Sequence, residues 1–374
     1  MNIRVEQKPA REIFSTSVLQ QSALWSEVKK RHGVASRAFD IETTKSDLYI
    51  SSREEKKIID DLLLLFLPVG NGRTIGYVPF GPTLKPDIEN RGPFLEELSE
   101  SLRPYLPEGC ILLRFDLVWE SPWADDDSCF DASGNWQGPP SKKSREIRLN
   151  IDTVNWNLHK ADTDLLPPDT IHIDLRKDDQ RLLAEMKPKT RYNVGLSLRR
   201  GVRVRSAGLD DLEIWYSLYA ETCARNSIYC EEKSYFGAVL EAGIGRKTPS
   251  ASTELLIAEN DAGPLAAMFL VVSNRRATYL YGASASDGRN HMATYAIQWD
   301  AMRRARGKGC VEYDLFGIAP NPNPTHPLHG LYRFKSGFGG WMLHRMGCWD
   351  YPLKPDEYEA YRSIEMSGSG YHLR

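Results

Sequence analysis

The chain has 374 residues, which corresponds to about two domains at roughly 150 residues each. Its composition, 41% hydrophobic and 26% charged, is typical of a globular protein and excludes a disordered or collagen-like chain. The 48 basic and 50 acidic residues leave a net charge of -2, so any affinity for nucleic acid must come from a local basic patch.

The longest apolar run, LLLLFLPV at 62–69, is far shorter than the ~20 residues that span a bilayer. It predicts a buried strand, and we expect no transmembrane segment. The N-terminus is charged and lacks the apolar core of a signal peptide, so we expect a cytoplasmic protein. The six cysteines form no CxxC pair and are expected to be reduced, packed thiols. His326 and His329 have no third ligand nearby in the sequence, and we expect no metal site.

Residues 62–82 predict two strands joined by a turn at 70–72. A helical stretch at 93–105 follows, and then a short apolar strand that carries Asp116 after a Gly-Cys step. We expect Asp116 at the end of this strand, where a carboxylate can face a cleft and act as a base. The alternative is that it only caps a neighbouring turn.

The segment 120–168 has a different composition, rich in Asp, Pro, Ser and Lys. We expect it to be a long exposed excursion and domain joint.

The stretch 187–205 has seven basic residues and no acid. Gly201 predicts the end of a helix after Arg200, and the alternation at 202–205 predicts a strand. Such a patch fits a polyphosphate partner, and a solvated helix face is the alternative. The basic residues are Lys187, Lys189, Arg191, Arg199, Arg200, Arg203 and Arg205.

Residues 254–283 repeat the earlier strand pattern, with turns at 261–264 and 274–275. A helix at 291–307 and a short apolar strand ending at Asp314 follow, as they do in the first half. Two copies of a β-β-β-α-β unit predict a duplicated α/β domain. We expect the ligand in the cleft between the copies.

The segment 330–340, GLYRFKSGFGG, mixes aromatic residues, two cations and several glycines. Glycines allow a backbone to approach a ligand closely, and Lys335 would supply a fixed positive charge. A glycine-rich turn around an ordinary surface lysine is the alternative.

Six stretches, spread in order over nearly the whole chain, resemble the Fem family (FemABX) of aminoacyl-tRNA-dependent peptidyltransferases. These enzymes add amino acids to the stem peptide of peptidoglycan precursors. The stretches are LQQSALWSEVKKRHG (19–33), YVPFGP (77–82), KTRYNVGLSLRRGV (189–202), LYAETCARNSIY (218–229), YLYGAS (279–284) and GLYRFKSGFGG (330–340).

The resemblance implies an α/β fold of two tandem acyl-CoA N-acyltransferase-like domains, each a mixed sheet flanked by helices. The first, 1–165 plus 342–374, would bind the precursor, and the second, 166–341, would face the aminoacyl-tRNA. No heptad-bearing hairpin is inserted, so the chain is similar to the compact branch without a coiled-coil arm.

The resemblance also implies roles for single residues. Lys29, Arg225 and Tyr229 match residues that hold the diphosphate and sugar end of the precursor. Tyr281, with Tyr279 as the alternative, matches a tyrosine of the substrate cleft. Phe334 and Lys335 match a Phe-Lys pair near the ester of the charged tRNA.

Two positions depart from related patterns. Acyl-CoA enzymes of this fold cradle the cofactor in a glycine-rich turn, but residues 286–297, SDGRNHMATYAI, lack the glycine pair, so we expect no coenzyme A and no other cofactor. The family often has Asp-Pro where this chain has Asp116-Leu117, which weakens the alignment of the candidate base.

The expected reaction is attack of a stem-peptide amine on the ester of an aminoacyl-tRNA, forming an amide. Lys335 would face the oxyanion or the departing ribose oxygen, and Asp116 could accept the amine proton. The precursor would be nucleotide-linked or lipid-linked, with membrane-surface contact in the latter case, and the protein a monomer. The residues expected to bind tRNA are Lys189, Arg191, Arg199, Arg200 and Arg203, together with Arg303, Arg304, Arg306 and Lys308.

Two other functions remain open from the sequence. One is an N-acyltransferase that uses acyl-CoA or a carrier-bound acyl group on a different amine. The other is a non-catalytic relative that binds RNA or a nucleotide sugar.

Overall fold

The computed structural model describes residues 1–243 and 251–367, which form two compact units. Of the described residues, unit 1 contains Met1–Phe14, Gln20–Pro168 and 344–367, and unit 2 contains Ser15–Leu19 and the rest of 169–343. The expected domain bounds, 1–165 plus 342–374 and 166–341, stay a prediction. Residues 244–250 and 368–374 of those domains lie outside the described chain.

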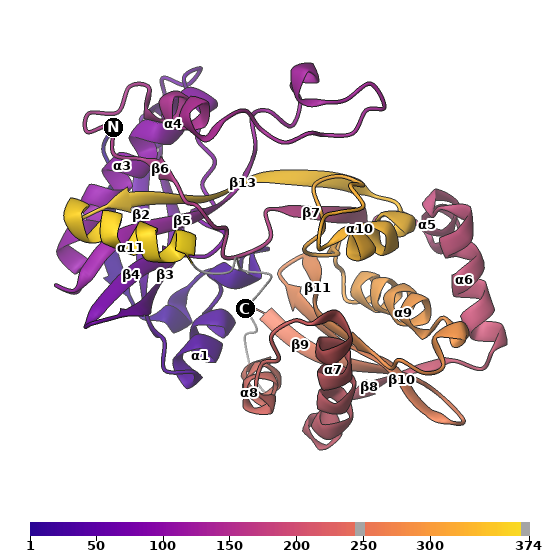
Figure 1. Cartoon of the computed structure of the whole chain (residues 1–374). Helices are drawn as coiled ribbons and strands as arrows, with labels where there is room; N and C mark the ends of the chain where they lie inside the picture. Colours follow the sequence, from indigo (N-terminus) through magenta and orange to yellow (C-terminus); the bar gives the residue numbers. More distant parts are fainter. Residues whose placement is uncertain (244–250, 368–374) are drawn as a thin grey trace. The chain divides into compact units, whose positions relative to one another are not determined.

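Unit 1 is built on a mixed sheet with strand order β1-β2-β3-β4-β5-β13. Its neighbours are antiparallel except β4 and β5, which are parallel. The C-terminal strand β13 (yellow in Figure 1) pairs with β5 from residue Arg345 onward, and β6 pairs with β13. The strands are β1 (Arg4–Lys8), β2 (Ala35–Thr44), β3 (Lys57–Gly70), β4 (Arg73–Val78), β5 (Cys110–Glu120), β6 (His159–Lys160) and β13 (Trp341–Pro352).

Helix α3 connects the parallel strands β4 and β5, because a parallel pair needs a crossover rather than a hairpin. Its apolar face, with Phe94, Leu95 and Leu98, packs into the core that the buried residues of β3 and β5 form. The helices of unit 1 are α1 (Ala23–Arg31), α2 (Lys45–Leu48), α3 (Arg91–Leu102), α4 (Lys142–Asn150) and α11 (Pro355–Ser367).

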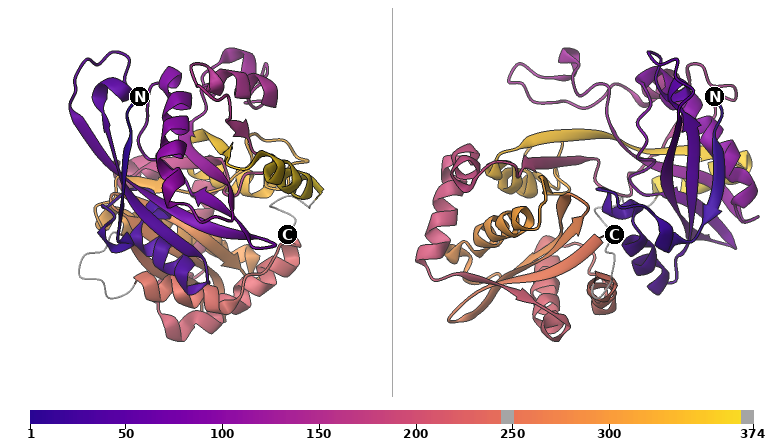
Figure 2. Two further views of the ribbon diagram at one scale, coloured as in Figure 1. Left: turned by 90° about the vertical axis from the view of Figure 1, so that its left-hand side faces the viewer. Right: turned by 180° about the vertical axis from the view of Figure 1, so that it is seen from behind.

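Unit 2 has the strand order β7-β12-β11-β10-β9-β8. Helices α6 and α9 pack on one face of this sheet and α7 and α8 on the other (Figure 1; Figure 2). The strands are β7 (Asp169–Asp174), β8 (Arg203–Ala207), β9 (Ala251–Asn260), β10 (Gly263–Ser273), β11 (Arg276–Ser284) and β12 (Glu312–Asp314). The helices are α5 (Asp179–Glu185), α6 (Pro188–Arg199), α7 (Leu212–Asn226), α8 (Lys233–Gly243), α9 (Ala293–Gly307) and α10 (His329–Lys335).

The two units share one topology, which confirms the predicted duplicated α/β fold. In each, three antiparallel strands lead through a helix into a strand parallel to the third: β2-β3-β4-α3-β5 in unit 1 and β9-β10-β11-α9-β12 in unit 2. An antiparallel strand then flanks the parallel one, β13 beside β5 and β7 beside β12.

The segment 120–168 is less exposed than its composition predicts. The ring of Trp136 stacks on His344 with centroids 3.9 Å apart, and Leu149 and Leu158 belong to the core of unit 1. Apolar residues scattered through a polar segment therefore attach it to the sheet, and the expected exposed excursion is partly buried.

Candidate functional site

Asp116 lies inside strand β5 rather than at its end, because the strand continues to Glu120. Its side chain is fully buried. Tyr77 Oη donates a hydrogen bond of 2.9 Å to Oδ2, and the backbone N–H of Leu166 donates one of 3.1 Å to the same oxygen. The other oxygen, Oδ1, has no hydrogen-bond partner in the part of the chain that the structure describes. A buried carboxylate with one unused acceptor is suited to receive a proton.

Burial raises the pKa of Asp116 to about 7, and the negative charge of Asp164 acts in the same direction. The hydrogen bond from Tyr77 and the positive charge of Lys160 oppose this rise in pKa. At neutral pH the carboxyl group can therefore both bind and release a proton, which is what a general base requires.

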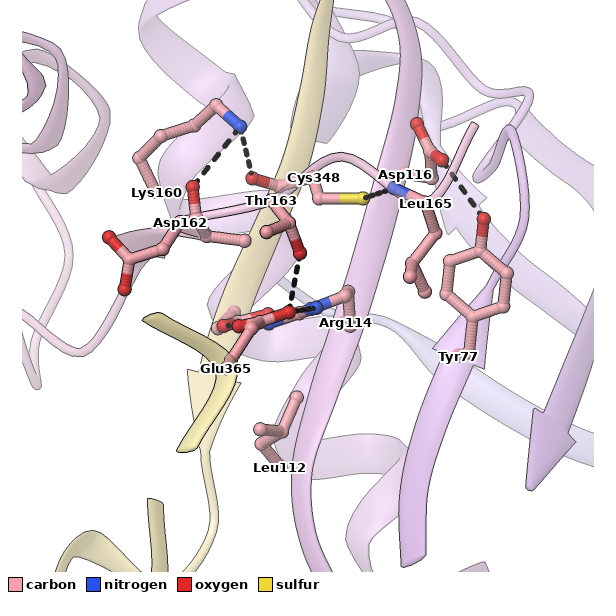
Figure 3. A network of polar contacts seen from close by, with 12 residues as sticks. Tyr77, Leu112, Arg114, Asp116, Lys160, Asp162, Thr163, Leu165, Cys348 and Glu365 are labelled. Carbon is pink, nitrogen blue, oxygen red and sulfur yellow. Dashed lines mark hydrogen bonds and ion pairs between the residues drawn. The ribbon is translucent and has the colours of Figure 1, made fainter. Parts of the chain in front are cut away.

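A buried polar network surrounds Asp116 (Figure 3). Lys160 Nζ lies 2.7 Å from Asp164 Oδ1 and donates to the carbonyl oxygen of Cys348 at 2.9 Å. The N–H of Cys348 donates back to Asp164 Oδ1 at 2.6 Å. Burial raises the pKa of the Cys348 thiol well above its ordinary value, so this sulfur is not a nucleophile at neutral pH.

Arg114 lies two residues before Asp116 on β5 and is buried. It forms an ion pair with Glu365 of the C-terminal helix α11. Its guanidinium forms two hydrogen bonds to Asp350, of 2.6 and 2.8 Å, and two to Glu365, of 2.6 and 3.0 Å. Paired charges of this kind fix the position of β5 and β13 in the core. The arginine therefore supports the strand that carries Asp116.

Lys29, the other predicted site residue of unit 1, lies in the last turn of α1 and is half-buried. The Oγ of Ser22 caps this helix by accepting the N–H of Trp25 at 3.2 Å. The Lys29 ammonium lies 4.9 Å from the Trp25 ring centroid, within the range of a cation–π contact.

In unit 2, Lys335 ends helix α10 and is buried, with 5% of its surface exposed. Its ammonium donates to the carbonyl oxygens of Phe316 and Gly317 at 3.1 and 2.9 Å. It also lies 5.1 Å from the ring centroid of Tyr279. The alternative of an ordinary surface lysine is therefore wrong.

Burial lowers the pKa of Lys335 to about 7, although the negative charge of Asp314 opposes the change. Near neutral pH this amine can therefore both hold and release its proton, and the expected fixed positive charge stays a prediction. Asp314 is itself held by Thr170 Oγ1 at 2.5 Å and by the N–H of Phe316 at 2.8 Å.

His172 joins this cluster from strand β7. Its Nδ1 lies 2.8 Å from Glu312 and its Nε2 lies 3.5 Å from Asp314. Burial lowers the pKa of His172, but the two carboxylates outweigh burial and the net pKa is raised. Sequence reasoning missed His172, since β7 and β12 are paired only in the folded chain.

The glycines after Lys335 approach the protein itself. A Cβ on Gly337 would meet Thr190 Oγ1 at 2.1 Å, and one on Gly340 would meet the carbonyl oxygen of His172 at 2.1 Å. The expected close approach to a ligand is therefore replaced by close internal packing. Phe334, beside Lys335, packs edge-on against Tyr295 with centroids 5.1 Å apart.

A β-bulge separates the two candidate tyrosines of strand β11. Phe269 of β10 pairs with Tyr281, while the next residue, Leu270, pairs with Tyr279, so Leu280 is skipped. Tyr279 packs on the face that carries α9 and contacts Lys335. Tyr281 lies with the aromatic residues of the opposite face, and its hydroxyl is 2.8 Å from that of Tyr235.

Arg225 and Tyr229 lie at the end of helix α7. The Arg225 guanidinium is fixed by hydrogen bonds of 3.0 Å to the carbonyl and hydroxyl oxygens of Ser284 and to the hydroxyl of Ser286. Tyr229 follows the helix and is 60% exposed. Arg225 is therefore pre-oriented at the end of β11, whereas Tyr229 faces solvent.

The basic stretch divides into exposed and paired residues. Lys189, Arg191 and Arg199 are exposed on α6, which ends before the left-handed Gly201 as predicted. Arg200 bonds to the carbonyl oxygen of Asn290, and Arg203 pairs with Asp261 at 2.7 Å. The cations of α9 are also paired, namely Arg303 and Arg306 with Asp179, Arg304 with Asp300 and Glu254, and Lys308 with Glu254.

Within residues 1–243 and 251–367, no group of three or more His, Cys, Asp or Glu side chains is arranged to hold a metal ion. Over the same residues, none of the helices has the length and apolar character needed to cross a membrane.

Comparisons with known proteins place this fold in a family. The sequence matches the FemAB family over residues 12–242 and 246–366. The lipid II:glycine glycyltransferase of Staphylococcus epidermidis is 23% identical over 256 residues, which are 53% of this chain and 62% of the relative. The chain therefore spans less than two thirds of the length of that curated relative.

Two solved structures share the fold. The crystal structure of FemX has a TM-score of 0.70 at 18% identity, covering 94% of this chain and 96% of that one. A tandem GNAT protein from the clavulanic acid biosynthesis pathway has a TM-score of 0.50 at 11% identity, covering 94% and 98%. Because the family match extends over both units, the chain belongs to the FemAB family.

Proposed function

We propose that this protein is an aminoacyltransferase that moves an amino acid from aminoacyl-tRNA to an amine on the stem peptide of a peptidoglycan precursor. The observation that carries the proposal is the FemAB family match across both units. The buried ionisable groups Asp116 and Lys335 support it, because burial brings the pKa of each to about 7, and the family resemblance marks Lys335.

In this reaction the protein supplies proton transfer, and no side chain needs to form a covalent intermediate. The amine nitrogen forms a bond to the ester carbonyl carbon, and the bond from that carbon to the ribose oxygen breaks. Asp116 receives the proton that the amine loses, directly or through water. Lys335, as an ammonium, stabilises the oxyanion and gives a proton to the departing ribose oxygen. A lysine whose pKa is about 7 donates this proton more readily than an exposed lysine does.

Arg225 supports precursor binding in this scheme, because its guanidinium is already oriented by Ser284 and can pair with phosphate oxygens. Lys29 and Tyr229 complete the proposed precursor contacts. Phe334 and Tyr279 would line the substrate site beside Lys335, because Tyr279 contacts that lysine, whereas Tyr281 lies on the opposite face of the sheet.

The exposed cations of α6 are the best candidates for tRNA contacts. Lys189, Arg191 and Arg199 face solvent on one helix, and no acidic residue lies between 187 and 205. Phosphate contacts of this kind give affinity that falls with salt and reads little sequence. Arg200 and Arg203 would have to leave their present partners to take part.

The acceptor is proposed to be lipid-linked, because the curated relatives are named lipid II:glycine glycyltransferases. The test is to incubate the full chain with charged tRNAs and with either lipid-linked or nucleotide-linked precursor, and to measure the mass of the acceptor. We expect a gain of one or more aminoacyl residues. If the acceptor gained mass only when coenzyme A thioesters replaced the charged tRNA, the proposal would be contradicted.

A further inference from the structure

Unit 1 exposes a group of large apolar side chains on α4 and in the loop that follows it. Ile147, Ile151, Val154 and Trp156 have 46%, 41%, 88% and 55% of their surface exposed. They lie within ten residues of sequence, and Ile147 and Ile151 are one helical turn apart. Large apolar side chains that are exposed this close together in the sequence indicate an interaction surface more than isolated ones do.

The loop reverses the usual arrangement of polar and apolar side chains. Thr153 is buried, and its hydroxyl donates to the carbonyl oxygen of Asn150 at 2.8 Å. The Asn157 amide donates to the carbonyl oxygen of Pro352 at 2.8 Å. The polar residues thus bind to the unit, while Val154 and Trp156 between them point to solvent.

The loop is firmly attached, so the exposure is not a consequence of a loose segment. The buried carboxylate of Glu96 accepts the N–H groups of Val154 and Asn155 at 2.6 and 2.7 Å. The amide of Asn150 bonds to the carbonyl oxygen and the N–H of Leu158 at 2.8 and 3.0 Å, closing the loop. Trp156 has a left-handed backbone, with φ 49°, which is unfavourable for a bulky residue. The fold therefore holds the apolar side chains outward.

Basic side chains flank these apolar ones. Lys143 and Arg148 are exposed on α4, and Arg148 makes a long, exposed pair with Glu89 at 3.5 Å. The one acid on the helix, Glu146, accepts the N–H of Lys160. The loop that follows α4 adds one acidic residue, Asp152, to the charges around the apolar side chains. Apolar residues including a tryptophan, bordered by cations, match the interface of an anionic bilayer.

We propose that the α4 surface, defined as Ile147, Ile151, Val154 and Trp156 with Lys143 and Arg148, docks the protein on an anionic membrane. Val154 and Trp156 enter the headgroup region, and the two cations contact lipid phosphates. The inference goes beyond the proposed transfer reaction. It fits a lipid-linked acceptor, but its test needs neither donor nor acceptor.

The test is sedimentation of the full chain with phosphatidylcholine vesicles that contain or lack phosphatidylglycerol. We expect binding to the anionic vesicles that weakens with salt. The double variant Val154→Ser/Trp156→Ser should bind at least about tenfold more weakly, since it removes the inserted groups. Lys143→Glu/Arg148→Glu should lower affinity by about fivefold for each cation lost.

The matched control is Ile50→Ser/Ile59→Ser, because these side chains are also large and exposed in unit 1, at 61% and 53%. This variant should bind vesicles like the wild type. The proposal would be overturned if the wild type did not bind the vesicles, which is the result expected if this surface docks a protein instead. It would also be overturned if Val154→Ser/Trp156→Ser bound the vesicles as tightly as the wild type. A wild-type protein that binds the vesicles but transfers no amino acid would instead contradict the proposed function alone.

Discussion

Asp116 and Lys335 are buried ionisable side chains whose pKa values move toward about 7 from opposite directions. The sequence marked Lys335 through its resemblance to a family motif and Asp116 through its place in a short apolar strand. It could not predict their ionisation, because that depends on burial and on Asp164 and Asp314, which come near only in the folded chain. For the same reason, Tyr279 and Tyr281 could not be told apart, since the bulge at Leu280 is a property of strand pairing.

The Asp116→Asn variant should be more stable than the wild type above neutral pH. Burial raises the pKa of Asp116 from its ordinary value of 3.8 to about 7, so the folded state binds more protons than the unfolded state between these two pH values. Wild-type stability therefore falls as pH rises through that window, by up to ~1.4 kcal/mol per pH unit. Thermal unfolding of both proteins at about pH 5 and pH 8 measures the difference. Equal destabilisation of the variant at both values would contradict the assignment.

The rate of transfer should have a maximum near neutral pH. Asp116 must lose its proton, which requires a pH above about 7, and Lys335 must keep its proton, which requires a pH below about 7. Lys335→Arg keeps its charge at all accessible pH values, so its alkaline fall should disappear. We expect its kcat to be lower by about 10²-fold, because the donor is displaced. A pH profile of kcat for both proteins is the measurement, and an unchanged alkaline limb would refute the role of Lys335.

At the scale of elements, local signals predicted the central strands and the crossover helix of each unit. The Gly-Asn-Gly turn between β3 and β4 has three consecutive residues with positive φ, and Gly201 ends α6 as expected. Strand β7 and helix α4 were missed, because their place depends on pairing and packing with distant residues. The glycine turn after α10 was found but misinterpreted, since its glycines serve contacts with β7 and α6.

Gly340→Ala should destabilise the protein, whereas Gly330→Ala should not. A Cβ at 340 would lie 2.1 Å from the carbonyl oxygen of His172, and Gly340 has φ +82°, so we expect a loss of about 2–4 kcal/mol. A Cβ at Gly330 would meet nothing within 4 Å, and alanine favours the helix by up to about 1 kcal/mol. Chemical denaturation of the two variants makes the comparison, and equal effects would show that the turn is not tightly packed.

Charge reversal on α6 should weaken tRNA binding and its salt dependence together. Lys189→Glu/Arg199→Glu removes two exposed cations, and each lost phosphate contact should lower the slope of log K against log salt by about 0.9. Arg4→Glu/Lys30→Glu makes the same change of charge on unit 1 and serves as the control. Filter binding over a salt series gives both slopes. Identical slopes for the two variants would remove α6 from the tRNA interface.

The whole molecule repeats one topology in two units that have separate cores. Sequence reasoning found this repeat because strand spacing, turns and the Gly-Cys step recur in both halves. The return of the C-terminal strand β13 to β5 was implied by the family resemblance, since a pairing between segments so far apart leaves no local signal. The family match is what links this fold to the proposed aminoacyl transfer.

The most direct test of that link is a single-turnover reaction of enzyme, acceptor and tRNA charged with a radiolabelled amino acid. The account predicts that the label leaves the tRNA and appears in the stem peptide as an acid-stable amide. Lys335→Met should slow this transfer by about 10²-fold or more. Label that stays on the tRNA or is released as free amino acid, while the acceptor remains unlabelled, would contradict the account.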